Sequence, residues 1–103
     1  MHVISKQPFS EAAAKYPNDK ERIMDIYNVL RRGEFDTPGT MKETFSSLDN
    51  FKYKDKWWVI DIGGNNLRLI AAILFSCQKI FVKHIVTHAE YDKICTRYRR
   101  GEL

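Results

Sequence analysis

The stretch that decides the fold runs from Gly63 to Asp92. It reads Gly63-Gly64-Asn65-Asn66-Leu67-Arg68-Leu69-Ile70-Ala71-Ala72-Ile73-Leu74-Phe75-Ser76-Cys77-Gln78-Lys79-Ile80-Phe81-Val82-Lys83-His84-Ile85-Val86-Thr87-His88-Ala89-Glu90-Tyr91-Asp92. Glycine and asparagine open it, and they supply the positive φ angles of a hairpin turn. Apolar and β-branched residues then predict strands over 67–75 and 79–86. Because the first of these is apolar on nearly every residue, we expect both its faces to be covered.

A further strand is predicted before this turn. Residues 51–56 alternate aromatic and basic side chains, and residues 57–62 are rich in β formers. The three segments together predict an antiparallel meander.

Helices are predicted on either side of the meander. Two amphipathic patterns come first, and their apolar positions are Phe9, Ala12, Ala13 and Tyr16, then Ile23, Ile26, Tyr27 and Leu30. This spacing predicts two helices, separated by Pro17 and closed by Gly33. After the meander, Thr87 and Glu90 have the spacing of a capping box, which predicts the start of a last helix.

Composition limits the class of protein. The chain has 103 residues, which fits one domain over residues 1–103. Its net charge of +4 is compatible with a nucleic acid or an acidic protein as partner. No apolar run is long enough to cross a bilayer, and no signal peptide is recognisable, so we expect a cytoplasmic protein that has no membrane partner. Cys77 and Cys95 are expected to be free thiols.

Arg68 is a charged residue inside an otherwise apolar strand. Its head must reach the rim of the sheet, pair with a carboxylate or face a cleft. Asp61 on the preceding strand is an available partner, so a structural ion pair is one interpretation. Binding of a phosphodiester is the other, because the planar fork of arginine suits that group.

His88 and Tyr91 lie three residues apart at the predicted helix start, so they occupy neighbouring positions on one face. The positive end of the helix dipole disfavours the protonated imidazole. A neutral histidine beside a phenol is a reasonable acid–base pair. The alternative is a surface histidine and a core tyrosine. His84, His88 and Asp92 also have a four-residue spacing, but His84 belongs to a strand, so a metal site is not expected.

Lysines form the third candidate feature. On a strand, Lys52, Lys54 and Lys56 would point to one side, beside aromatic residues, as suits an RNA backbone and stacked bases. The alternative is a solvated edge strand whose lysines prevent edge pairing. Lys83 is added to this predicted RNA-binding set.

Three motifs carry a resemblance to a known family. They are Ser47-Leu48-Asp49-Asn50-Phe51-Lys52-Tyr53, Gly63-Gly64-Asn65-Asn66-Leu67-Arg68-Leu69-Ile70 and Thr87-His88-Ala89-Glu90-Tyr91-Asp92. With the length and element order, they resemble HigB-type toxins of the RelE-like superfamily. The resemblance implies an α+β fold: a small twisted antiparallel sheet, two N-terminal helices packed on one of its faces, and a short C-terminal helix.

The resemblance also implies a function. Such a toxin enters the ribosome and cuts messenger RNA during translation, without a metal or other cofactor, by attack of the ribose 2′-hydroxyl on the adjacent phosphate. Its partners are then a HigA-type helix-turn-helix antitoxin, the ribosome and mRNA, with operator DNA reached only through the antitoxin. By resemblance, Arg68 holds the scissile phosphate, His88 and Tyr91 transfer protons, and a lysine adds charge.

Three other functions are open at this point. A ParE-like toxin that inhibits gyrase shares the fold but lacks the catalytic set. A non-enzymatic RNA- or ribosome-binding module would use the same basic face. A structural subunit would use that face only to meet an acidic antitoxin.

Overall fold

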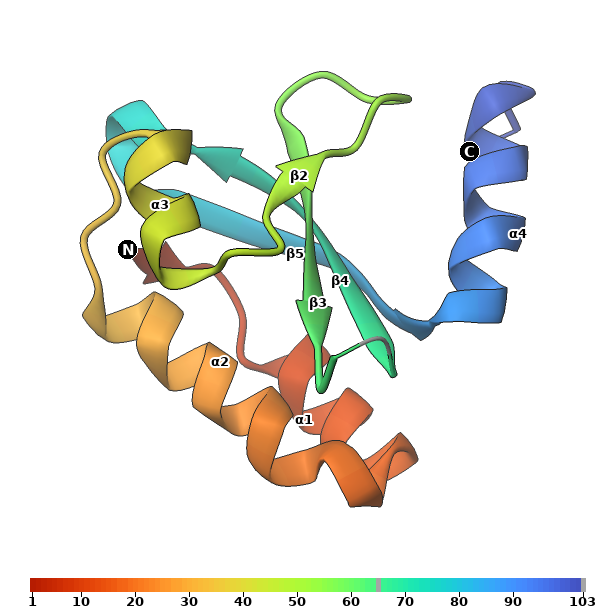
Figure 1. Cartoon of the computed structure of the whole chain (residues 1–103), viewed down its shortest axis with the longest axis horizontal. Helices are drawn as coiled ribbons and strands as arrows, with labels where there is room; N and C mark the ends of the chain where they lie inside the picture. Colours follow the sequence, from red (N-terminus) through yellow and green to blue (C-terminus); the bar gives the residue numbers. More distant parts are fainter. Residues whose placement is uncertain (65, 103) are drawn as a thin grey trace.

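The computed structural model describes residues 1–64 and 66–102, and this part of the chain forms four α-helices and one five-stranded sheet (Figure 1). The helices are α1 (Gln7–Lys15), α2 (Lys20–Arg32), α3 (Pro38–Thr44) and α4 (His88–Arg99). The strands are β1 (His2–Val3), β2 (Asp49–Asn50), β3 (Trp57–Ile62), β4 (Leu67–Leu74) and β5 (Lys79–Thr87), in the sheet order β1-β5-β4-β3-β2.

The predicted α+β fold and its antiparallel meander of β3, β4 and β5 are confirmed. At one edge the sheet differs from the prediction, because β1 pairs with the start of β5 in parallel. The sheet is therefore mixed. This pairing involves two residues of β1, too short a segment to show a strand period in the sequence.

The turn between β3 and β4 is built on glycines with positive φ, +62° at Gly63 and +71° at Gly64. Asn65, the third residue of the predicted turn, lies outside the described residues. A Cβ atom on Gly63 would lie 2.9 Å from Oδ1 of Asp19, a buried carboxylate that pairs with Arg22. The hairpin tip is thus fitted against the start of α2. Its register places Asp61 directly opposite Arg68.

The sheet has a hydrophobic core on each face. On one face, buried side chains of α1 and α2 such as Phe9, Ile23 and Leu30 pack against Leu69 and other residues of the meander. The other face carries a smaller cluster of Phe51, Val59 and Ile70, covered by Tyr91, Ile94, Cys95 and Tyr98 of α4. Figure 1 shows α4 standing apart from α1 and α2. The expectation that both faces of the central strand are covered is confirmed.

A β-bulge changes the direction of side chains halfway along β5. Ala71 pairs with Val82, but the preceding residue, Ile70, pairs with His84. Lys83 is the extra residue, and a bulge of this kind lets two successive side chains leave the same face of a strand. Lys83 and His84 both reach the aromatic residues on the α4 side.

Residues 51–56 are a loop, so the prediction of a lysine-bearing strand there is wrong. The amide of Lys54 donates to the carbonyl of Phe51, the amide of Trp57 donates to that of Lys54, and Lys56 has a left-handed φ of +62°. Because β2 already pairs with Trp58 and Val59, the intervening residues must reverse the chain. Phe51 is buried as the centre of the smaller core, so the aromatic–basic alternation does not reflect a pleat.

Candidate functional site

Arg68 contacts Asp61, the partner that its sequence context suggested, and it also contacts Tyr91. Its Nε lies 3.3 Å from Oδ1 of Asp61, and its guanidinium lies 4.5 Å from the centre of the Tyr91 ring. The Nε atom is buried and has no hydrogen-bond partner among the described residues. Its contact with Asp61 is therefore an ion pair and not an aligned hydrogen bond. The side chain remains 24% exposed. It is thus held between a carboxylate and an aromatic face while part of it is open to solvent.

The start of α4 places His88 beside Tyr91. The hydroxyl of Thr87 accepts the Glu90 amide at 3.3 Å, which confirms the predicted N-cap. The Glu90 carboxylate instead contacts the residue that follows α1, because the Tyr16 hydroxyl donates to it at 3.4 Å. His88 is exposed, and its ring centre lies 6.3 Å from that of Tyr91. Arg68, Tyr91 and His88 therefore form a row at one rim of the sheet.

The Tyr91 phenol is held in its protonated form. Burial raises the pKa of Tyr91 to about 12, the neighbouring Cys95 thiol acts in the same direction, and the positive charge of Arg68 opposes them. At neutral pH this group can donate a proton or a hydrogen bond. His88 is the member of the row whose imidazole can accept one.

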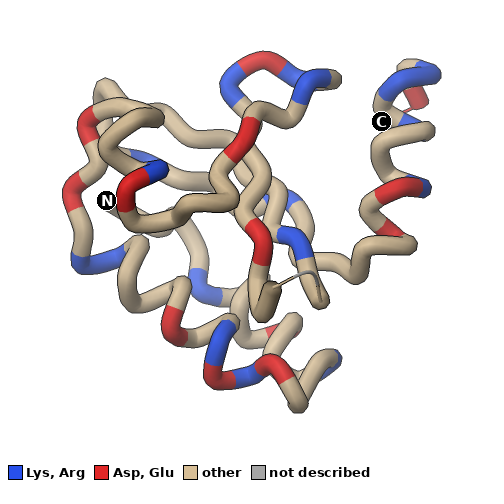
Figure 2. Tube along the Cα trace, viewed as in Figure 1, with Lys and Arg blue, Asp and Glu red and all other residues tan. Residues whose placement is uncertain are grey.

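Three of the four predicted RNA-binding lysines, Lys52, Lys54 and Lys83, lie on the α4 side of the sheet, each next to an aromatic ring. The Nζ atom of Lys54 lies 5.5 Å from the Tyr98 ring centre, that of Lys83 lies 5.7 Å from Trp57, and that of Lys52 lies 5.3 Å from Tyr53. Figure 2 shows Lys and Arg gathered on the loop 51–56 and on the C-terminal turns of α4. The structure brings these cations to one face without making them a single stripe.

A second pair of titratable groups was missed by the sequence reasoning. Nε2 of His84 lies 3.2 Å from the Tyr98 hydroxyl, between Lys83 and the aromatic cluster. Burial lowers the pKa of His84, and the charge of Lys83 lowers it further. Burial likewise raises the pKa of Tyr98. The sequence signal was the polar pair Lys83-His84 in mid-strand, a break in alternation that is typical of a bulge.

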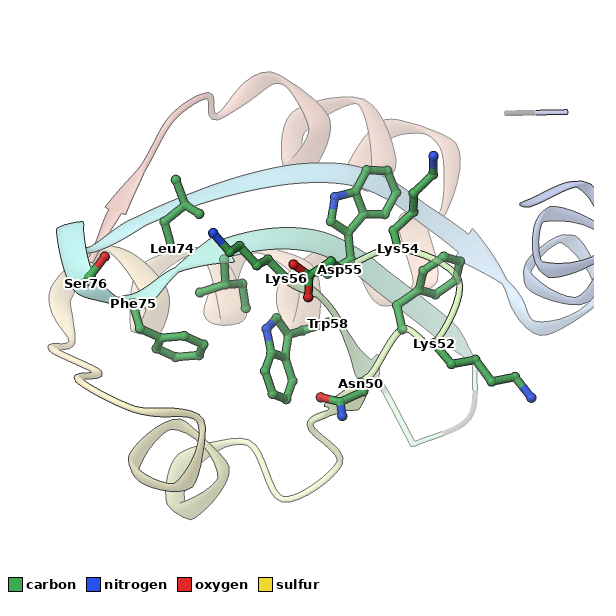
Figure 3. Close-up of a pocket in the computed structure, with 12 residues that line it drawn as sticks. Asn50, Lys52, Lys54, Asp55, Lys56, Trp58, Leu74, Phe75 and Ser76 are labelled. Carbon is green, nitrogen blue, oxygen red and sulfur yellow. The ribbon is translucent and has the colours of Figure 1, made fainter. Parts of the chain in front are cut away.

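A pocket of about 580 Å³ opens at the opposite end of the β3–β4 hairpin from Arg68 (Figure 3). Its walls are aromatic residues of β3 and of the chain after β4, and its rim is the loop 51–56. Its lining includes Lys52, Lys54, Lys56, Trp57, Trp58 and Phe75. Ile73 at the pocket lies five positions after Arg68 along β4, or about 16 Å along a strand.

Among the described residues, the His, Cys, Asp and Glu side chains form no cluster of three or more that could hold a metal ion. The helices of this part of the chain lack the length and apolar composition needed to span a membrane.

Comparison with known proteins identifies relatives along the whole chain. A family model described as the HigB toxin, RelE-like toxic component of a toxin–antitoxin system, matches residues 19–94. A protein of Escherichia coli O6:H1 named mRNA interferase HigB is 53% identical over 102 residues, 99% of each chain. The mRNA interferase toxin HigB of Escherichia coli K12 is 42% identical over 92 residues, 89% of this chain and 88% of the relative. The mRNA interferase HigB of Shigella flexneri is similar to the same extent.

Proposed function

Because this chain belongs to the HigB family of RelE-like toxins, we propose that it is an mRNA endoribonuclease that acts on translating ribosomes and cleaves with Arg68, Tyr91 and His88. The family resemblance inferred from the three sequence motifs is confirmed. As the toxic component of a toxin–antitoxin system, the protein has an antitoxin as its partner. We further propose that this antitoxin is of the HigA type, that it links the toxin to operator DNA, and that the toxin acts in the cytoplasm.

The observation that carries the proposal is the row Arg68–Tyr91–His88. RNA cleavage by its own 2′-hydroxyl needs a base for that hydroxyl, an acid for the departing 5′-oxygen and positive charge at the phosphate. Arg68 supplies the charge from a fixed position, since Tyr91 and Asp61 hold it on two sides. Because the pKa of Tyr91 is raised to about 12, its phenol suits the donor role, and His88 then takes the role of base.

The reaction follows from these roles. His88 accepts the proton of the 2′-hydroxyl as its oxygen attacks phosphorus. The bond from phosphorus to the 5′-oxygen breaks, and Tyr91 donates a proton to that oxygen. The products are a 2′,3′-cyclic phosphate and a free 5′-hydroxyl. The ribosome would supply orientation of the message, which is worth much of the barrier in reactions of this kind.

The test is to add the purified protein to translating ribosomes and map the 5′ ends of the message. We expect new 5′ ends only while translation proceeds, and a loss of at least about 100-fold in cleavage rate on Arg68→Ala. Lys42→Ala on α3, an exposed lysine remote from the row, is the control with one charge removed. An intact message together with stalled replication would instead favour the gyrase-inhibiting function.

A further inference from the structure

The pocket under the loop 51–56 combines flat aromatic walls with amines, and neither feature belongs to the row at Arg68. Trp58 and Phe75 meet edge to face, with ring centres 5.8 Å apart and planes at 90°. A planar ring can therefore stack on one of them with its own edge against the other. Figure 3 shows Lys56 extending from the loop toward Leu74, beside these two rings.

From this arrangement we propose that the pocket is a nucleobase subsite. One base of a single-stranded RNA would stack on the Trp58–Phe75 wall, and its phosphates would lie against the amines of Lys52, Lys54 and Lys56. The proposal deepens the proposed function, because it assigns this second position along the RNA to a different part of the protein. Stacking on aromatic rings beside a basic rim is how single strands are held without a base-pairing partner.

The charge of the rim supports an anionic ligand. Three lysines line the pocket and one carboxylate, that of Asp55, opposes them. The same end of the molecule carries the basic C-terminal turns of α4. Lys54 of the loop contacts this helix, because its amine lies over the Tyr98 ring. A polyanion that enters the pocket thus meets net positive charge on the pocket rim and on its α4 side.

The rim is built in advance of binding. Hydrogen bonds close the loop on itself, and the carbonyl of Lys56 accepts the Ile73 amide at 3.0 Å, which fixes the loop to β4. Lys56 has a φ of +62°, a left-handed conformation that is strained for a lysine and that glycine adopts freely. A strained residue that nonetheless places an amine at a pocket is a reason to look for a role for that amine.

The test uses the intrinsic fluorescence of the full-length protein, because the chain has two tryptophans and both line the pocket. The probes are a short single-stranded RNA, an abasic ribose-phosphate chain of the same length and hexaglutamate, each added without ribosomes. We expect the RNA to quench the tryptophans and to bind about tenfold or more tightly than the abasic chain. Equal binding of the RNA and the abasic chain would overturn the proposal. Equal binding of hexaglutamate would show a general polyanion surface that suits an acidic antitoxin segment, and this too would overturn it.

Lys56→Gly separates binding from folding. It removes the amine and relieves the left-handed backbone, so the free energy of unfolding should not decrease. We expect weaker RNA binding and a slope of log K against log salt that is smaller by about 0.7 to 1. Lys42→Ala is the matched control and should bind as the wild type does. An unchanged affinity and salt slope in Lys56→Gly would show that the Lys56 amine does not contact the RNA.

A second variant tests the wall. Phe75→Leu keeps an apolar side chain but loses the flat face, so the advantage of RNA over the abasic chain should shrink. If base-dependent binding is absent while ribosome-bound message is still cut, the subsite alone is wrong. If base-dependent binding is present while no message is cut, the proposed endoribonuclease function is wrong and the subsite stands.

Discussion

The guanidinium of Arg68 lies over the Tyr91 ring, 4.5 Å from its centre, while its Nε lies 3.3 Å from the Asp61 carboxylate. The two contacts act in opposite ways on a bound phosphate. Tyr91 fixes the direction of the cation without neutralising it, whereas Asp61 competes with any other anion. The availability of Arg68 for a substrate therefore depends on Asp61.

Asp61→Asn tests this competition. The amide keeps the size of the side chain but removes the charge that opposes an RNA phosphate. We expect RNA to bind more tightly, by a few-fold at low salt and less at high salt, because the contact is partly exposed and is screened. Binding of RNA at two salt concentrations measures it. If affinity falls instead, the ion pair is needed to hold Arg68, and the structural interpretation of Arg68 is the better one.

Tyr91→Phe tests the proton donor. Phenylalanine preserves the ring under Arg68 and the contact with Phe51, so the fold should be retained. We expect cleavage on ribosomes to slow by about 10²–10⁴-fold, the usual contribution of one acid–base group. Spectrophotometric titration of the phenols gives an independent readout, because the group with a pKa of about 12 should vanish from the curve of the variant. Full activity in Tyr91→Phe would exclude this phenol as the acid.

His84 should make stability depend on pH. Burial and Lys83 keep its pKa in the folded protein below the usual 6.5, so the unfolded chain binds a proton more readily. The free energy of unfolding should therefore decrease as the pH falls from above 6.5 toward the folded-state pKa. Denaturant unfolding at several pH values measures this, with His84→Gln as the comparison. The decrease should be smaller in the variant, and identical pH dependence in the two proteins would contradict the prediction.

The two glycines of the β3–β4 turn form a matched pair. Gly63→Ala should destabilise the fold by more than Gly64→Ala, although both have left-handed φ values. Backbone strain of about 1–2 kcal/mol applies to each. Only at Gly63 does the new Cβ meet the carboxylate of Asp19 at 2.9 Å, since the space beside Gly64 is open. Chemical denaturation of both variants gives the difference, and equal losses would show that the contact with Asp19 is unimportant.

The sequence predicted the meander and the start of α4 well, for physical reasons. Apolar β-branched segments and a Gly-Gly turn leave few alternatives to a hairpin, and Thr87 is a strong cap. The register that sets Arg68 opposite Asp61 follows from the turn. The row of Arg68, Tyr91 and His88 could be predicted because the turn fixes where β4 begins and the Thr87 cap fixes where α4 begins.

The parts that failed depend on tertiary contacts. The loop 51–56 has the alternation of a strand, but Phe51 is the centre of a core that only α4 completes. The apolar pair Val3-Ile4 suggests a brief edge strand in the sequence, but so short a segment gives no signal for its parallel pairing with β5. The contact between His84 and Tyr98 joins a strand to a helix fourteen residues later, which no local pattern encodes.

The bulge at Lys83 makes the length of β5 as important as its composition. Val82 packs against the core under α1 and α2, and so does Ile85, although two residues lie between them, whereas strict alternation would place one or three there. The extra residue shifts the alternation of side-chain faces by one residue between the two halves of β5. Deleting Lys83 would leave His84 and Ile85 on their present faces. If instead the same residues kept strict alternation, His84 would face the apolar core and Ile85 the α4 side. The connection into α4, and with it the position of His88, would start from the wrong face of the sheet.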